Sequence, residues 1–261
     1  STLATALRTP VVLLGAWGMT LLSGSVHETG QVGARSLVYL VLSGLATGAS
    51  WLCYFKALQL GDVSKVAPVD KMSTVLTVIM AVLLLGEGLS ALGAVGLALV
   101  TVGTLLMLRA EDLRSLPRAL AGGGGWLLYA LGAALFAALT AILGKIGIAA
   151  VPSDLGTAIR TGIVLVMAWV MVGVAGRLGS ATRVPRGEMI WILLSGAATC
   201  ASWLCYFRAL QDGPASVVVP IDKLSVLVSV AFSVLVLREH VGVRALLGLA
   251  MLVVGTVALA L

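Results

Sequence analysis

A long internal repeat is the feature that most constrains this chain of 261 residues. Residues 43–73 and 195–225 lie 152 positions apart and are identical at 21 of 31 positions, without a gap. The same offset relates two further pairs of segments: 1–9 with 153–161, and Gly103-Thr104 with Gly255-Thr256. A repeat that reaches across the chain in this way predicts two related structural units.

The composition places these units in a membrane. The chain is 60% hydrophobic and 11% charged, whereas soluble domains carry about 25% charged residues. Nine stretches approach the roughly 20 apolar residues that a membrane-spanning helix needs: about 9–26, 37–60, 64–86, 91–109, 126–149, 157–176, 189–210, 215–238 and 243–261. Lys and Arg produce a net charge of +6 but sit in short loops between these stretches. That pattern favours orientation in a bilayer and gives no support for a nucleic-acid partner.

The fold class predicted from these stretches is an all-α integral membrane protein with about nine transmembrane helices. The first repeat covers 1–109 with four helices, a charged and glycine-rich linker covers 110–125, and the second repeat covers 126–261 with five. The helix at 126–149 has no counterpart, so we expect the first repeat to lack its opening helix. Because a five-helix unit has an odd number of spans, two such units in series should be inverted relative to each other.

Each half carries a Pro-x-Asp-Lys run inside an apolar stretch. The two runs contain Pro68, Asp70 and Lys71, and Pro220, Asp222 and Lys223. A charge at the bilayer centre costs about 2.5–3.5 kcal/mol even on insertion scales, so these charges must face partners or water. Neighbouring residues on a helix point about 100° apart, so Asp and Lys of one run should pair poorly. We therefore expect cross-repeat pairs, Asp70 with Lys223 and Asp222 with Lys71.

Two interpretations of these charges remain open. In one, they form a structural ion-pair network that locks the halves together; in the other, they form a substrate or proton site near the membrane midplane. The prolines favour the second, because Pro68 and Pro220 each leave a carbonyl one turn earlier without its usual donor. Such carbonyls are tolerated at membrane depth where they line a cavity or find other partners. Ser73 and Ser225, three residues after each Asp, share its helix face and extend the polar stripe.

A second shared element, Ser-Trp-Leu-Cys-Tyr-Phe, supplies aromatic candidates in both halves: Trp51, Tyr54, Trp203 and Tyr206. Trp and Tyr three residues apart share a helix face and could form an aromatic wall for an organic or cationic substrate. The alternative is a packing cluster or a belt at the membrane interface. We also expect Arg8 and Arg160, which occupy equivalent positions, to anchor their helices at the interface.

The sequence contains no pattern for catalysis or cofactor binding. It has no Walker loop, catalytic triad, metal-ligand cluster or dinucleotide fingerprint, and its three cysteines lie in apolar segments without metal-ligand companions. We therefore predict no catalytic residues, no metal, no cofactor and no enzymatic activity.

The motifs resemble those of the EamA-type units of the drug/metabolite transporter superfamily. The resemblance is carried by Ala-Thr-Ala-Ile-Arg-Thr, by Trp-Leu-x-Tyr-Phe-[Lys/Arg]-Ala-Leu and by Pro-x-Asp-Lys, and it covers nearly the whole chain twice. It implies a secondary transporter with inverted five-helix units around a central cavity. It also implies small organic substrates such as amino acids, metabolites or amphipathic cations, moved by exchange or with protons.

The expected function is transport of small organic metabolites or drugs by alternating access, coupled to protons or another gradient. The alternatives are a lipid-linked sugar flippase and a non-transporting membrane scaffold. Expected partners are membrane lipid, a small-molecule substrate and, as a candidate, a second copy of the chain. The expected location is the plasma membrane, with the bacterial inner membrane favoured.

Overall fold

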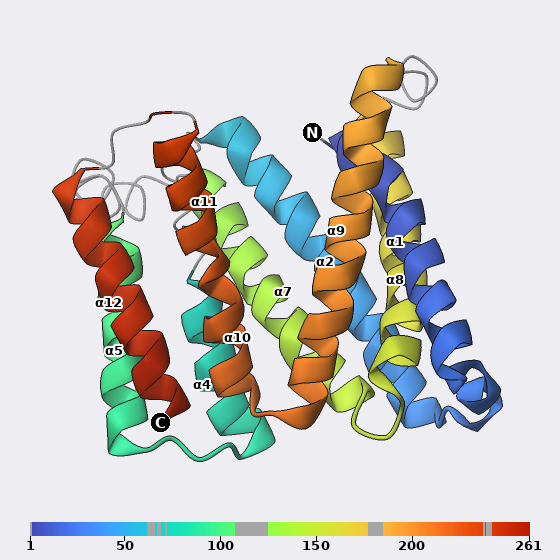
Figure 1. Cartoon of the computed structure of the whole chain (residues 1–261), viewed down its shortest axis with the longest axis horizontal. Coiled ribbons are helices and arrows are strands. Elements are labelled where there is room, and N and C mark those ends of the chain that lie inside the picture. The colour runs from blue at the N-terminus through green and yellow to red at the C-terminus, as the bar shows by residue number, and fades with distance from the viewer. Residues whose placement is uncertain are drawn as a thin grey trace. The chain divides into compact units, whose positions relative to one another are not determined.

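The computed structural model describes residues 2–61, 66, 69–70, 72–107, 125–176, 185–236, 238 and 242–261. Pro68, Lys71 and nearly all of the expected linker, 110–124, lie outside this part of the chain. Every regular element in the described residues is a helix (Figure 1). The elements are α1 (Thr2–Ser23), the 3-10 helix η1 (Ser25–Gln31), α2 (Ala34–Leu60), α4 (Ser73–Leu85), α5 (Ala91–Leu106), α7 (Gly125–Gly147), α8 (Ser153–Val174), α9 (Arg186–Asp212), α10 (Ala215–Lys223), α11 (Ser225–Leu235) and α12 (Val243–Ala260).

The helices are those of a multi-pass membrane protein. Seven candidate spans are long and apolar enough to cross a bilayer, and α4 and α5 are shorter apolar helices. Each of the nine predicted stretches contains a helix, but the boundaries differ. Helices α1 and α8 begin at Thr2 and Ser153, several residues before the apolar stretches, because helical hydrogen bonding continues through polar flanks. The stretch predicted at 215–238 is divided into α10 and α11 at Leu224.

The described chain divides into two compact units, and each contains helices from both sequence repeats. Unit 1 comprises 1–49 and 143–212, and unit 2 comprises 50–142 and 213–261. Helices α2 and α7 therefore contribute residues to both units. The division into repeats rests on sequence similarity and stays a prediction.

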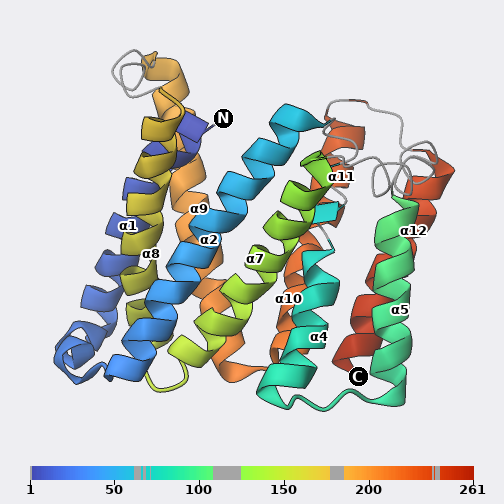
Figure 2. The ribbon, with the colours of Figure 1, turned by 180° about the vertical axis from the view of Figure 1, so that it is seen from behind.

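In unit 1, α1 lies beside both α8 and α9 (Figures 1 and 2). Ser23, at the end of α1, donates a hydrogen bond to Asp154 at the start of α8, so these two helices run antiparallel. Glycines let the helices approach closely at two equivalent crossings. A Cβ on Gly44 would lie 3.0 Å from the Arg160 carbonyl oxygen, and one on Gly196 would lie 3.0 Å from that of Arg8.

In unit 2, α5 and α12 pack side by side through four glycines (Figures 1 and 2). A Cβ on Gly96 would lie 2.6 Å from the Gly255 oxygen, and one on Gly103 would lie 2.6 Å from the Gly248 oxygen. The earlier glycine of α5 meets the later glycine of α12, and the later glycine of α5 meets the earlier one of α12. The two helices are therefore antiparallel. Backbones approach this closely only where both helices carry small residues, as is common in membranes.

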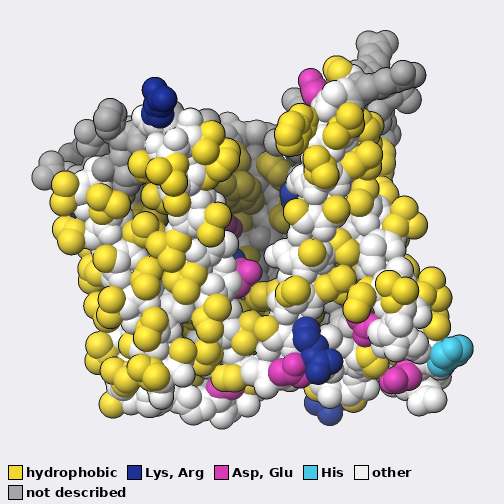
Figure 3. Space-filling model, in the orientation of Figure 1, with side chains coloured by type: hydrophobic (Ala, Val, Ile, Leu, Met, Phe, Trp, Pro, Cys, Tyr) yellow, Lys and Arg dark blue, Asp and Glu magenta, His cyan; other side chains and the backbone are white. Residues whose placement is uncertain are grey.

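The outward surfaces suit contact with lipid. On the face seen in Figure 3, hydrophobic side chains cover α12 and α9, and few acidic or basic side chains interrupt them. Exposed apolar side chains on these two helices include Leu246, Leu247 and Val254 on α12, and Trp191, Leu193 and Leu194 on α9. A soluble protein rarely exposes an apolar surface of this extent.

Candidate functional site

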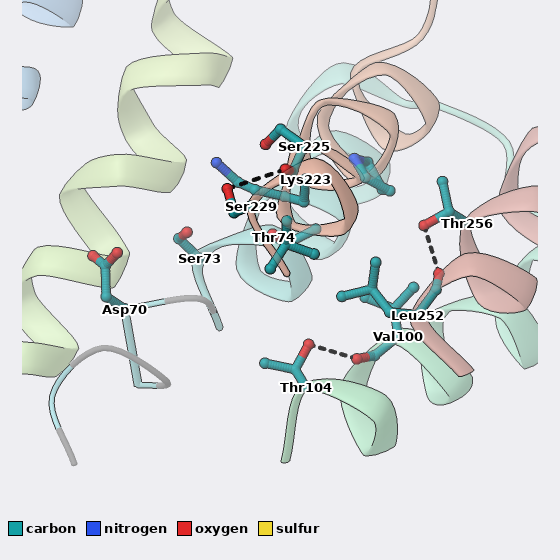
Figure 4. A pocket seen from close by; sticks show the side chains of 12 residues that line it. Asp70, Ser73, Thr74, Val100, Thr104, Lys223, Ser225, Ser229, Leu252 and Thr256 are labelled. Carbon is teal, nitrogen blue, oxygen red and sulfur yellow. Dashed lines mark hydrogen bonds between the residues drawn. The ribbon is translucent and has the colours of Figure 1, made fainter. Parts of the chain in front are cut away.

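Unit 2 contains a polar pocket of about 310 Å³. Its walls come from the Asp70 segment, α4, α5, α10, α11 and α12 (Figure 4). The lining residues are Asp70, Ser73, Thr74, Val100, Thr104, Pro220, Lys223, Ser225, Val226, Ser229, Leu252 and Thr256. Six of these carry hydroxyl groups, so a solute inside would meet many hydrogen-bonding partners within apolar helices.

The pocket follows the sequence repeat. Four pairs of lining residues are separated by the repeat offset of 152: Ser73 and Ser225, Thr74 and Val226, Val100 and Leu252, and Thr104 and Thr256. Equivalent positions of the two repeats therefore meet around one space. Among the described lining residues, two are charged, and they break this equivalence because Asp70 comes from the first repeat and Lys223 from the second.

The charged residues of the Pro-x-Asp-Lys runs are not arranged as the sequence predicts. Lys223 Nζ lies 3.4 Å from Oδ2 of its neighbour Asp222, and the two side chains are 43% and 37% exposed. The expectation that adjacent Asp and Lys would pair poorly is wrong here, because the long lysine stem can bend back to the preceding carboxylate. Asp70 and Lys223 do line the same pocket, whereas Asp222 does not. The expected pair of Asp222 with Lys71 falls on a residue that the structure does not describe.

The pocket hydroxyls are oriented by their own helices. Thr104 Oγ1 donates to the Val100 carbonyl at 2.7 Å, and Thr256 Oγ1 donates to the Leu252 carbonyl at 2.8 Å. A hydroxyl that donates to its own helix keeps its lone pairs for accepting. Together with the Asp70 carboxylate, these oxygens favour hydrogen-bond donors or a cationic group in the pocket. Thr104 and Thr256 are not among the site residues predicted from the sequence, although the repeated Gly-Thr pair is the signal that could have identified them.

Glu87 organises the helix that carries Pro220 and Lys223. Its two carboxylate oxygens accept hydrogen bonds from the backbone N–H groups of Ala215, at 2.7 Å, and Ser216, at 2.8 Å. These groups begin α10, where N–H groups have no partner within the helix and the helix dipole favours negative charge. Pro220 lies buried within α10, and the helix ends three residues later at Lys223.

The predicted aromatic residues are not part of the pocket lining. Tyr54 packs against a buried apolar cluster in unit 2 that includes Ala57 and Leu127, and Trp51 is half-buried. Trp203 and Tyr206 belong to unit 1. Tyr206 packs edge-to-face on Phe207, with ring centroids 5.2 Å apart. An aromatic wall made by these four residues stays a prediction, because none of them is among the lining residues of the Asp70 pocket.

Arg160 differs most from its predicted role. Instead of anchoring α8 at the interface, it is 2% exposed, within the core of unit 1. Its guanidinium carbon lies 4.9 Å from the Trp203 ring centroid and 4.4 Å from that of Phe207. The expectation failed because the sequence places Arg160 near the start of an apolar stretch, whereas α8 begins a further turn earlier at Ser153. Arg8, its equivalent, is half-buried.

The long apolar helices are those of a multi-pass membrane protein, and unit 2 contains a pocket of about 310 Å³. The EamA-like transporter family matches residues 2–109 and again residues 124–261, and the chain belongs to this family of membrane transporters. A curated relative from Sinorhizobium sp., described as an uncharacterized transporter in the cobO 3' region, is 42% identical over 135 residues. That match spans 52% of this chain and 96% of the relative, which is thus about the size of one repeat.

The fold also occurs among solved structures. One, described only as a crystal structure of a protein, superposes with a TM-score of 0.73 at 17% sequence identity. The superposition covers 98% of this chain and 86% of the other. At this level of identity the likeness concerns the fold alone.

Proposed function

We propose that this chain is a secondary transporter that moves small organic metabolites or drugs by alternating access. Coupling to protons or to another solute gradient supplies the energy, and the bacterial plasma membrane is the proposed location. The observation that carries the proposal is the pocket of unit 2, where a carboxylate, an ammonium group and six hydroxyl-bearing residues surround a space of about 310 Å³. The bacterial source of the Sinorhizobium relative supports the location.

The proposed architecture is a pair of inverted repeats with four spans in the first and five in the second. The seven long candidate spans, with the shorter α4 and α5, make up nine. The antiparallel packing of α5 on α12 supports inversion, because these helices occupy equivalent places in the two repeats. Gly96 meets Gly255 while its equivalent Gly248 meets Gly103, as expected for a two-fold axis lying across the helices.

Within this proposal, Asp70 binds the coupling proton or a cationic group of the substrate. Lys223 supplies the counter-charge, and its contact with Asp222 keeps it in place between transport steps. Ser73, Ser225, Thr104 and Thr256 provide hydrogen bonds to the solute. A carboxylate in such a pocket can exchange its proton for a cationic or hydrogen-bonding group as the pocket opens on either side.

The test is uptake into proteoliposomes under an imposed pH gradient, with a panel of amino acids, amines and organic cations. Asp70→Asn removes the charge but keeps the shape of the side chain. We expect it to reduce gradient-driven uptake at least tenfold while the variant still folds. Asp222→Asn should have a smaller effect, because Asp222 does not line the pocket.

Asp212→Asn is the matched control, since Asp212 is 59% exposed and pairs with Arg208 on the surface. It should transport like the wild type. Unchanged uptake in Asp70→Asn would contradict the site assignment. Movement of lipid-linked sugars without uptake of any soluble solute would support a flippase instead, and misfolding of Asp70→Asn without a selective loss of transport would support a scaffold.

A further inference from the structure

Arg160 is a buried charge in unit 1 that the proposed transport pocket does not use. It lies in α8 and is 2% exposed. Arginine remains protonated in proteins, so a full positive charge sits within a membrane-spanning helix. A buried charge is stable only when aromatic faces, hydrogen-bond acceptors or an opposite charge replace its hydration.

Two of these three compensations are present. Trp203 and Phe207, four residues apart on α9, lie within 4.9 Å and 4.4 Å of the guanidinium carbon. Thr47 Oγ1 accepts a hydrogen bond of 2.7 Å from Nη2. Thr47 itself donates to the Ser43 carbonyl at 3.0 Å, which orients its lone pair toward the arginine. These contacts hold the guanidinium in a fixed plane.

The third compensation, an opposite charge, is not supplied by the described residues. Nε and Nη1 are buried and have no hydrogen-bond partner among them. The acidic residues of unit 1 are engaged or placed elsewhere: Asp154 binds Ser23, Asp212 pairs with Arg208, and Glu28 and Glu188 are exposed. Nε and Nη1 are therefore the donors that a ligand could engage. Guanidinium N–H groups in one plane match the oxygens of a carboxylate or phosphate.

We propose that unit 1 contains a binding site for an oxyanion, the carboxylate or phosphate group of a small organic anion, with Arg160 as its anchor. Trp203 and Phe207 shield the ion pair from water, and Thr47 fixes the guanidinium. The site lies in the other unit from the Asp70 pocket, so it stands independently of the proposed transport site.

Arg8 provides an internal comparison, because it occupies the equivalent position in the first repeat. The backbone crossing beside it is the same as at Arg160, with Gly196 in the place of Gly44. Its side chain is half-buried beside a pocket of about 220 Å³ that Trp191 and Ser195 also line. No ring in the described residues stacks on it. Arg8 thus lies at the same kind of helix crossing as Arg160, but it lacks the aromatic rings that enclose Arg160.

The experiment measures anion binding to the purified full chain in a neutral detergent. Acetate, benzoate and inorganic phosphate are titrated at constant ionic strength against chloride, and thermal stability is followed. We expect saturable stabilisation by at least one oxyanion, because a ligand that binds only the folded state raises its stability. Arg160→Gln should weaken this binding at least tenfold, and Arg160→Lys should also weaken it, because an ammonium group lacks the planar fork. Arg8→Gln should bind like the wild type.

Tryptophan fluorescence provides a second readout that a purely structural role would not move. Binding should change the emission of the wild type, and Trp203→Phe should lose most of that signal. A wild type that responds to oxyanions no more than to chloride would overturn the proposal, as would wild-type affinity in Arg160→Gln. If Arg160→Gln does not fold, the test rests on Arg160→Lys, and oxyanion affinity equal to the wild type in that variant would overturn the proposal.

A parallel titration in nanodiscs separates the sources of the oxyanion. Competition between phosphatidylglycerol and phosphate would identify a lipid headgroup as the ligand, and indifference to that lipid would identify a soluble anion. Both results support oxyanion binding at Arg160. These binding measurements do not depend on transport. The oxyanion proposal can therefore fail while the uptake experiment on Asp70→Asn still supports the proposed transport site.

Discussion

At the scale of single residues, aromatic faces, backbone carbonyls and helix ends contribute to stabilising charged side chains in the described part of the chain. Arg160 is enclosed by aromatic rings, Lys145 donates to the Leu210 carbonyl at 3.2 Å, and Glu87 accepts from two N–H groups of α10. Helix ends and ring faces are available throughout a helical membrane protein, whereas a second buried charge would bring its own desolvation cost. The position of a charge in the sequence therefore says little about its partner.

Glu87 gives a prediction at this scale. Glu87→Gln removes the negative charge and one of the two acceptors at the start of α10, so we expect destabilisation of about 0.5–2 kcal/mol, the range of helix-cap substitutions. Thermal unfolding in detergent would measure it. Glu188→Gln, at an exposed position in the first turn of α9, is the control and should change stability little. Equal stability of Glu87→Gln and the wild type would show that the contact does not hold α10.

At the scale of elements, close backbone approach at glycines decides which helices pair. The crossing of α5 and α12 brings carbonyl and amide groups of one helix against the Cα atoms of the other. Helices in lipid associate through such packing, since lipid tails are as apolar as the helix surface. The break between α10 and α11 at Leu224 is a second feature of this scale, because it lies beside Lys223 and Ser225 in the pocket wall.

Gly103→Ala tests the α5–α12 contact. The new methyl group would lie 2.6 Å from the Gly248 oxygen and 2.9 Å from the Leu252 nitrogen, and backbone atoms cannot rotate away. We expect destabilisation of about 1–3 kcal/mol in thermal or chemical unfolding. Gly162→Ala is the matched control, because nothing lies within 4 Å of its Cβ position. It should be neutral or stabilise α8 by about 0.5–1 kcal/mol. The same effect from both substitutions would argue against close packing at Gly103.

At the scale of the whole molecule, the nine proposed spans predict which loops share a side of the membrane. Single cysteines at Thr29, in η1, and at Gly88, between α4 and α5, should react with an impermeant reagent from one side. A cysteine at Arg238, between α11 and α12, should react from the other. The background would carry Cys53, Cys200 and Cys205 replaced by alanine. If the cysteines at positions 29 and 238 are labelled from the same side of the membrane, the chain cannot have nine spans.

Several features could be predicted from the sequence, because each depends on local composition or on internal similarity. Apolar stretches of membrane-spanning length identified the helices, and the offset of 152 residues identified equivalent positions such as Ser73 and Ser225, which indeed line one pocket. The family resemblance was confirmed by matches to both halves of the chain. These conclusions need no knowledge of which helix packs on which.

Other features were decided only by tertiary structure. Thr47 and Arg160 are 113 residues apart and Glu87 and Ala215 are 128 apart, so no local pattern could pair them. The compact units combine pieces of both repeats, and the contact of Lys223 with its neighbour Asp222 depends on a side-chain conformation that residue spacing does not specify. Which groups compensate a buried charge depends on helix packing. The sequence could show that such charges exist, and only the folded chain shows what surrounds them.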